Sequence, residues 1–318
     1  MALRPAAHRL LSNLAKNLIC RRAYGIFLHE KKTIMMSILN YITWDVSPFI
    51  YDGEHFAVSW YGTLWTLGLI GLLLSILATF KHDKVPTQYA LITFIITLVC
   101  TIFFGHLFHG IFYEWYYTPD NPGYYLGIDW DYRNYYFDHP YKFFDFANGG
   151  FASHACVFGV LVAGLICSRA MKYDYWYPTD RAMMGLFWVA VAVRCANLIN
   201  NEIYGVETSL PWGFVFGGDS FASHPTQLYE LLSYLLAMAL AWWLFLKKDG
   251  GKYKGLITAV MLTTVMLLRI VIEFIKLPQM EIEATWCLNM GQWLSIPFAI
   301  WSIWWLYHSL KQGKNVNE

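Results

Sequence analysis

Residues 85–112 read VPTQYALITFIITLVCTIFFGHLFHGIF, a run of 28 residues that contains no Asp, Glu, Lys or Arg. A helix needs roughly 20 consecutive apolar residues to cross the roughly 30 Å hydrocarbon core of a bilayer. Three other uncharged runs are similarly long: 57–80, 151–168 and 284–310. Each of the four stretches therefore predicts a membrane-spanning helix.

Three further apolar stretches, 182–200, 226–246 and 255–275, carry one or two charges each and still read as spans. The chain is 57% hydrophobic and only 14% charged, whereas soluble domains carry about a quarter charged residues. These features predict an all-α polytopic membrane protein with about seven transmembrane helices.

The charge and the cysteines limit the partners. A net charge of +1 without a basic stripe argues against a nucleic-acid partner, so membrane lipids and membrane substrates are expected instead. The six cysteines show no paired spacing and are interpreted as small buried hydrophobic residues. His106 and His109 are too few to predict a metal site, and no cofactor is expected.

Alternate loops differ in their content of basic residues. Eleven Lys and Arg fall in one set of loops and three in the other. Because basic loops stay in the cytoplasm, the core is expected to begin on the outward side and to end with a cytoplasmic C-terminus. Two outward loops, 113–150 and 201–225, are predicted to form a small cap, since a connection as long as the first is rarely a simple linker.

The first 35 residues do not fit this orientation, because they carry seven Lys or Arg beside a terminus placed outside. They also lack the apolar core of a signal peptide. Two interpretations stay open: translation starts at Met35 or Met36, or residues 1–35 form a basic arm on the membrane surface. Residues 36–318 are expected to form the membrane domain.

Ionisable residues within the spans mark a candidate site, because an unpaired charge in hydrocarbon costs several kcal/mol. Arg194 and Arg269 both fall in the outer half of their spans, about 18 Å or more from the cytoplasmic side. Glu273 follows Arg269 by four residues and can pair with it on one helix face. Guanidinium groups suit the capture of phosphate, although structural ion pairs between helices are the alternative.

Other polar residues reach the same outer level. His154 enters its span from outside, and Gln227, Tyr229 and Glu230 begin the fifth span from that side. A histidine in a membrane helix is often a packing residue, but the shared depth with the arginines favours a functional role for His154.

The segment 193–205, VRCANLINNEIYG, resembles the signature Gly-Arg-x-(Gly/Ala)-Asn-(Phe/Trp)-aliphatic-Asn-x-Glu-x-x-Gly of the prolipoprotein diacylglyceryl transferases. It departs at Val193 and Leu198. Other segments resemble the family in the same order, and the resemblance covers about residues 36–310: Trp60-Tyr61-Gly62, 224–230 (HPTQLYE), 269–274 (RIVIEF) and 290–295 (MGQWLS).

The resemblance implies transfer of the diacylglyceryl group of phosphatidylglycerol to the lipobox cysteine of a preprolipoprotein, in the bacterial cytoplasmic (inner) membrane. The partners would be phosphatidylglycerol and preprolipoprotein signal peptides. By resemblance, His154 would be the thiol base or would orient it, and Arg194 and Arg269 would stabilise the departing phosphate. Binding roles would fall to Tyr61, Asn197, Glu202, Glu273, Gln227 and Tyr229.

Several positions depart from the family pattern. The family's Gly-Arg-x-Gly appears as 105–108 (GHLF), its His-Gly-Gly as 154–156 (HAC), and the Arg that often precedes His-Pro as Ser223. Larger residues in place of glycine block a close backbone approach. The alternatives are therefore a catalytically inactive or altered-specificity lipid-binding paralogue, or a seven-helix transporter.

Overall fold

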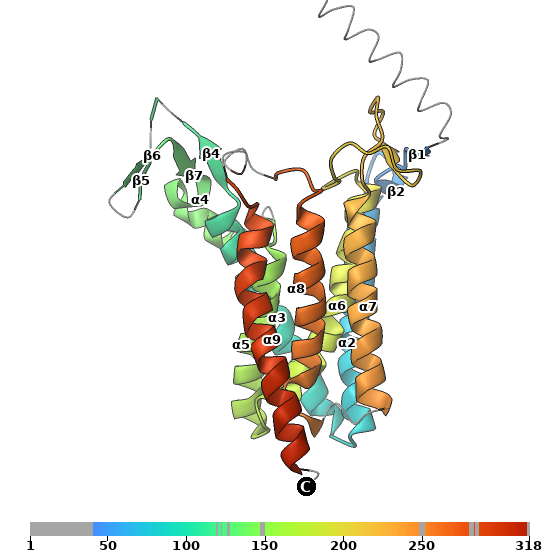
Figure 1. The fold of residues 1–318 in the computed structure, drawn as a ribbon, viewed down its shortest axis with the longest axis vertical. Helices are drawn as coiled ribbons and strands as arrows, with labels where there is room; N and C mark the ends of the chain where they lie inside the picture. Colours follow the sequence, from blue (N-terminus) through green and yellow to red (C-terminus); the bar gives the residue numbers. More distant parts are fainter. Residues whose placement is uncertain are drawn as a thin grey trace, which may run out of the picture. The chain divides into compact units, whose positions relative to one another are not determined.

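The computed structural model describes residues 41–316 except 119, 122, 126–127, 147–149, 248–251, 280–282 and 284–285. The described residues form two compact units, one of residues 41–45 with 206–224 and the other of residues 46–205 with 225–316. The larger unit holds all the long helices (Figure 1). The extension predicted at residues 1–35 lies outside the described residues.

Six long apolar helices confirm the prediction of a multi-pass membrane protein: α2 (Trp60–His82), α3 (Thr87–Phe112), α5 (Ser153–Met171), α6 (Trp176–Ile199), α7 (Thr226–Lys247) and α8 (Leu256–Glu273). Each has 18 residues or more and is apolar enough to cross a bilayer. The seventh predicted span forms α9 (Met290–Val316), which has 27 residues. Its tryptophans and polar residues leave it outside the set of six, so its crossing of the membrane stays a prediction.

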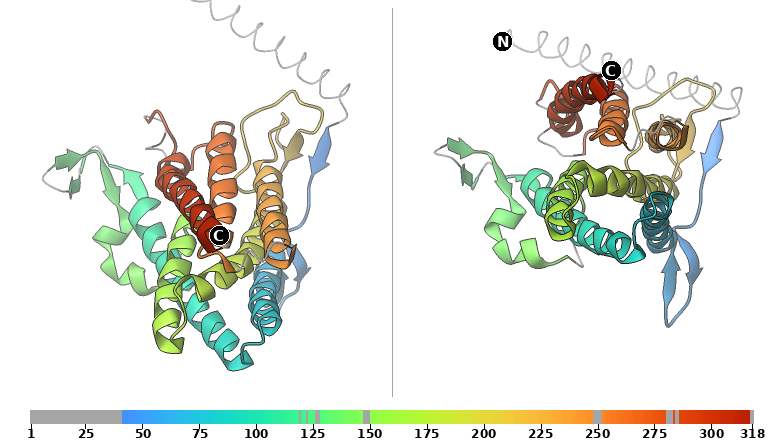
Figure 2. Two further views of the ribbon diagram at one scale, coloured as in Figure 1. Left: turned by 60° about the horizontal axis from the view of Figure 1, so that its bottom comes forward. Right: turned by 90° about the horizontal axis from the view of Figure 1, so that it is seen from below.

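Helix α6 is the most buried of the six and packs against α2, α5, α7 and α8 (Figure 2). Glycine allows the close approach of α2, because a Cβ at Gly68 would lie 2.9 Å from the Cα of Val189. Far from the functional end, buried Asp180 accepts hydrogen bonds from the backbone and hydroxyl of Thr258 at 2.9 and 2.6 Å. This contact joins α6 to the first turn of α8.

Short strands lie outside the helices. Strands β2 (Phe49–Asp52) and β3 (Ala57–Ser59) form an antiparallel pair before α2. Between α3 and α5 the chain forms two antiparallel pairs and two short helices: β4 (Trp115–Tyr117) with β7 (Tyr132–Asn134), β5 (Gly123–Tyr125) with β6 (Ile128–Trp130), α4 (Tyr135–Asp138) and η1 (Pro140–Phe144).

The two loops predicted to form one cap belong to different units. The loop 113–150 is part of the larger unit, whereas most of the loop 201–225 falls in the smaller one. There, β1 (Ile42–Trp44) and β8 (Phe214–Phe216) pair in parallel. Among the described cysteines, Cys100 and Cys167 are buried as expected and Cys156 and Cys195 are partly buried, but the expectation is wrong for Cys287, which is exposed.

Gly159→Ala is expected to destabilise the protein, because its Cβ would lie 2.8 Å from the Cys100 carbonyl oxygen across the α3–α5 contact. Overpacking costs about 1–3 kcal/mol and exceeds the helix propensity gained with alanine, which is at most about 1 kcal/mol. The matched control is Gly62→Ala, where the new Cβ would meet only Ser59 Oγ at 3.3 Å. Thermal unfolding in detergent should give a lower Tm for Gly159→Ala alone; equal Tm values would contradict the packing argument.

Candidate active site

The candidate site lies where several helices end at the same level of the bundle. Arg194 lies five residues before the end of α6, and Arg269 lies four residues before the end of α8. His154 and Glu230 lie in the first turns of α5 and α7, which run in the opposite direction. The helix directions thus place these side chains together, although they are far apart in sequence.

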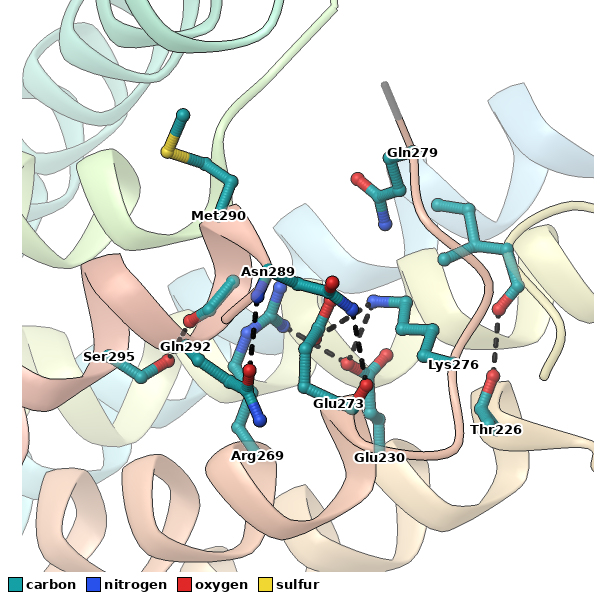
Figure 3. Close-up of polar contacts among 12 residues, drawn as sticks. Thr226, Glu230, Arg269, Glu273, Lys276, Gln279, Asn289, Met290, Gln292 and Ser295 are labelled. Carbon is teal, nitrogen blue, oxygen red and sulfur yellow. Dashed lines mark hydrogen bonds and ion pairs between the residues drawn. The ribbon is translucent and has the colours of Figure 1, made fainter. Parts of the chain in front are cut away.

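Glu230 is the centre of this site. One carboxylate oxygen of Glu230 lies 2.6 Å from Nε of Arg194, and the other lies 3.1 Å from Nη1 of Arg269. Lys276 approaches the second oxygen at 3.3 Å, and Figure 3 shows the Glu230 carboxylate between Arg269 and Lys276. All four side chains are buried. A single carboxylate therefore joins cations from three segments of the chain.

Glu273 takes a different partner from the one predicted. The spacing of four residues predicts a pair with Arg269, but within the described residues Glu273 forms an ion pair with Lys276, at 3.5 Å. Arg269 is instead held by Glu230 and by the hydroxyl of Tyr234, 3.4 Å away. The carboxylate from the neighbouring helix takes the place of the same-helix partner because it can reach both arginines.

Gly291 makes room for Glu273. A Cβ at Gly291 would lie 2.6 Å from the carboxylate carbon of Glu273, so any larger residue there would displace it. Burial lowers the pKa of Lys276 from its usual range, and the charge of Glu230 opposes this shift. The two carboxylates thus favour the charged form of Lys276.

Asn197 and Glu202 extend the network from Arg194. Arg194 Nη1 donates to Oδ1 of Asn197 at 3.0 Å, and the Asn197 amide donates to Glu202 at 2.9 Å. The side chain of Gln227 donates to the backbone carbonyl of Glu202 at 2.5 Å. This chain of contacts orients the Arg194 guanidinium from the loop that follows α6.

The histidine at the start of α5 has one engaged and one free nitrogen. Nε2 of His154 lies 2.8 Å from Oγ of Ser295 on α9. Ser295 uses its only proton to donate to the Gly291 carbonyl at 2.6 Å, so His154 Nε2–H must be the donor. The lone pair then lies on Nδ1, which is buried and has no hydrogen-bond partner among the described residues.

A cavity of about 360 Å³ lies beside these groups. Its wall is largely apolar, with contributions from α2, α5, α6 and α8. Four of the predicted site residues line it: Tyr61, His154, Arg194 and Arg269. An apolar chamber with two guanidinium groups and an imidazole on its wall fits an amphipathic anion such as a phospholipid.

The other predicted site residues do not line this cavity: Asn197, Glu202, Glu273, Gln227 and Tyr229. Asn197 and Glu202 act through Arg194, and Gln227 holds the Glu202 backbone. Tyr229 is half-buried in the first turn of α7. These residues surround the site rather than face its cavity.

Sequence reasoning placed Glu230 at the level of the arginines, with ion pairs between helices as one alternative, but it missed the roles of Lys276, Tyr234 and Ser295. Lys276 follows Arg269 by seven residues, which is two helical turns, so this spacing could have identified it. Tyr234 follows Glu230 by four residues, about one helical turn, so this spacing could have identified Tyr234 as well. The contact of Ser295 with His154 joins residues 141 positions apart and leaves no local signal.

The departures from the family pattern have distinct surroundings. His106 Nε2 donates to the carbonyl of Lys142 at 2.9 Å, so it ties α3 to η1. Among the described residues, no cluster of three His, Cys, Asp or Glu could hold a metal ion. Cys156, one of the departures from the family pattern, lines the cavity, where its side chain takes up volume.

The chain is similar to known proteins over most of its length. Residues 48–308 match the family model of the prolipoprotein diacylglyceryl transferases. A phosphatidylglycerol–prolipoprotein diacylglyceryl transferase of Porphyromonas gingivalis is 34% identical over 87% of this chain and 97% of its own length. Relatives of the same name from Chloroherpeton thalassium and Bacteroides fragilis are 32% and 28% identical, over 88% and 86% of this chain and 98% and 97% of their own lengths.

Glu230→Ala is expected to lower stability strongly, because it leaves three buried cations without their shared carboxylate. Breaking one partner of a buried ion pair typically costs about 3–5 kcal/mol. Glu230→Gln, which keeps the volume, should lose less than Glu230→Ala. Unfolding temperature and folded yield in detergent would measure this, with exposed Glu54→Ala as the control. Wild-type stability of Glu230→Ala would refute the central role of Glu230.

Proposed function

The chain belongs to the prolipoprotein diacylglyceryl transferase family, and from this membership we propose how its site performs the transfer. The reaction moves the diacylglyceryl group of phosphatidylglycerol onto the cysteine thiol of a prolipoprotein, the first step of lipoprotein maturation. The observation that carries the proposal for the site is the apolar cavity whose wall contains Arg194, Arg269 and His154.

The charges of the ion-paired cluster favour an anionic headgroup. Within the described residues, the buried ion pairs join Arg194, Arg269 and Lys276 to Glu230 and Glu273, three cations against two carboxylates. The excess of one positive charge matches the single negative charge of a phosphodiester. Phosphatidylglycerol would therefore complete the charge balance while its acyl chains occupy the apolar wall.

The free nitrogen of His154 provides a site for the thiol proton. A cysteine thiol has a pKa of about 8.5, so it needs a base to become a nucleophile near neutral pH. Nδ1 of His154 would accept that proton, while Ser295 holds Nε2–H and so maintains the tautomer. His154 is thus proposed as the base.

The chemical step then follows in balanced form. The thiolate attacks the glyceryl carbon that bears the phosphate ester, a C–S bond forms, and the C–O bond breaks. Glycerol phosphate leaves with the electron pair of that bond. Negative charge grows on the departing oxygen, and fixed guanidinium donors in a site of low polarity stabilise such charge strongly. Arg194 and Arg269 would supply them.

The remaining predicted residues fit supporting roles. Tyr61 would contact the lipid from the cavity wall, and Asn197 and Glu202 would position Arg194. Glu273 would act through Lys276, and Gln227 would hold the Glu202 segment. For Tyr229 a binding role rests on the family resemblance alone.

The proposed location rests on the apolar helices and on the distribution of basic residues among the loops. The protein crosses the membrane several times. We place it in the bacterial cytoplasmic membrane with the site near the outer leaflet and a cytoplasmic C-terminus, because basic residues concentrate in the loops at the opposite ends of the helices. Preprolipoprotein signal peptides would then present their cysteines at the level of His154.

Arg194→Lys and Arg269→Lys should each reduce turnover by about 100-fold or more, because lysine keeps the charge but loses the planar fork of donors. His154→Gln should reduce turnover at least as much, since it removes the base. The assay follows diacylglyceryl transfer to a labelled lipobox peptide in membranes that contain phosphatidylglycerol and lack any other transferase.

Arg181→Lys is the matched control, because Arg181 is a buried arginine on α6, the helix that carries Arg194. Its partner is Asp83, and it does not line the cavity. Its turnover should stay near that of the wild type. A folded wild-type protein without transfer would favour the inactive-paralogue alternative. Transfer from a different phospholipid alone would favour altered specificity, and solute transport without lipid product would favour a transporter.

Ser295→Ala tests the assignment of the His154 tautomer. Without the Ser295 oxygen, Nε2 loses its acceptor, and a fraction of His154 would carry its proton on Nδ1 instead. The expected result is a fall in kcat of about tenfold with KM for phosphatidylglycerol unchanged, and recovery in Ser295→Thr. A change in KM with kcat preserved would contradict a role through His154.

A further inference from the structure

The segment between α3 and α5 carries an exposed aromatic surface that the transfer reaction does not use. We define the arm as residues 135–146, which comprise α4, η1 and the two residues after η1. The arm exposes five large aromatic side chains: Tyr135, Phe137, Tyr141, Phe144 and Phe146. Phe144 is 76% exposed and Tyr141 is 62% exposed.

The opposite side of the arm is fixed to α3. Tyr136 is buried against Gly110, where no larger residue would leave room for its ring. Asn134 donates to the Gly110 carbonyl at 2.8 Å, and His106 donates to the Lys142 carbonyl at 2.9 Å. The arm is therefore held along the last turns of a candidate membrane span.

These contacts set the depth of the arm. Helix α3 has 26 residues and is about 39 Å long, which exceeds the hydrocarbon thickness by about 9 Å. His106 lies six residues, or about 9 Å, before the end of α3. With the helix centred, it extends about 4.5 Å beyond the hydrocarbon at each end, so His106 and the η1 residue that it contacts lie about 4.5 Å inside the hydrocarbon boundary.

The lipid-facing side of α3 continues onto the arm. Ile95, Val99 and Phe103 follow one another at four-residue spacing and are all exposed. The ring of Phe103 then contacts the ring of Phe146, with centroids 6.5 Å apart. An apolar stripe thus runs along the span from Ile95 to Phe103 and on to Phe146, two residues after exposed Phe144.

The charged residues of the arm are compatible with this environment. Lys142 pairs with Asp145 at 3.0 Å, and Arg133, just before the arm, pairs with Asp138 at 2.7 Å. The pairs leave this segment electrically neutral. Aromatic side chains are enriched at the boundary between hydrocarbon and headgroups, whereas exposed phenylalanines in water are unfavourable.

We propose that the arm is an interfacial anchor that docks on the lipid surface at the end of α3, with Phe144 inserted among the acyl chains and Tyr141 at the headgroups. Because the described contacts of the arm are with α3, docking of the arm would hold that helix at a defined depth in the bilayer. The alternative occupants of this surface are a protein partner or a second copy of the chain. The test below distinguishes both from the lipid surface.

The test measures depth with a nitroxide at Phe144→Cys in the full chain, with Cys20→Ser and Cys287→Ser to lower background labelling. Matched references are Ile95→Cys in mid-span and Lys254→Cys in a charged loop. In liposomes, the Phe144 label should collide often with oxygen and rarely with a nickel chelate, between the two references. Nickel access equal to that at Lys254, or a label immobilised by a second copy, would overturn the proposal.

A second measurement separates docking from folding. A nitroxide at Tyr141→Cys reports the arm while Phe144 is changed. Phe144→Ser should raise nickel access at position 141 severalfold, whereas Phe144→Trp should leave it unchanged. Equal access in both backgrounds, with the protein folded, would show that Phe144 does not hold the arm in the interface.

Discussion

The arrangement of the site depends on one buried carboxylate. Glu230 is shared by Arg194, Arg269 and Lys276, which come from α6, α8 and the segment after α8. Charges in a region of low polarity are tolerated only when they are paired, so the three cations are confined to the reach of this carboxylate. Because all three must be neutralised by Glu230, the ends of α6 and α8 and the segment after α8 must keep fixed positions around it.

The same constraint prepares the site for its substrate. Glu230 and Glu273 together leave one positive charge uncompensated in the ion-paired cluster. Arg194 and Arg269 face the cavity while their other contacts hold them from behind. A phospholipid headgroup can thus meet guanidinium groups that are already oriented, so little reorganisation is needed when charge develops on the leaving group.

Glycine positions and helix ends give this arrangement its shape. Gly291 leaves space for the Glu273 carboxylate, and Gly68 lets α2 approach α6 closely. The side chain of Cys156 lines the cavity and takes up part of its volume. Contacts of Gly110 and His106 fix residues 134–142 along the last turns of α3.

The sequence by itself determined the membrane class, six long apolar helices close to their predicted bounds, and the placement of Arg194, Arg269 and His154 near helix ends that lie at one level, because hydropathy and rise per residue are local properties. Only the tertiary structure decided which charges meet. Helical spacing predicts neighbours on one helix, such as Arg269 and Glu273, but Glu230 and Ser295 reach their partners from other helices. Contacts between helices depend on packing and crossing geometry, which no spacing along the chain encodes.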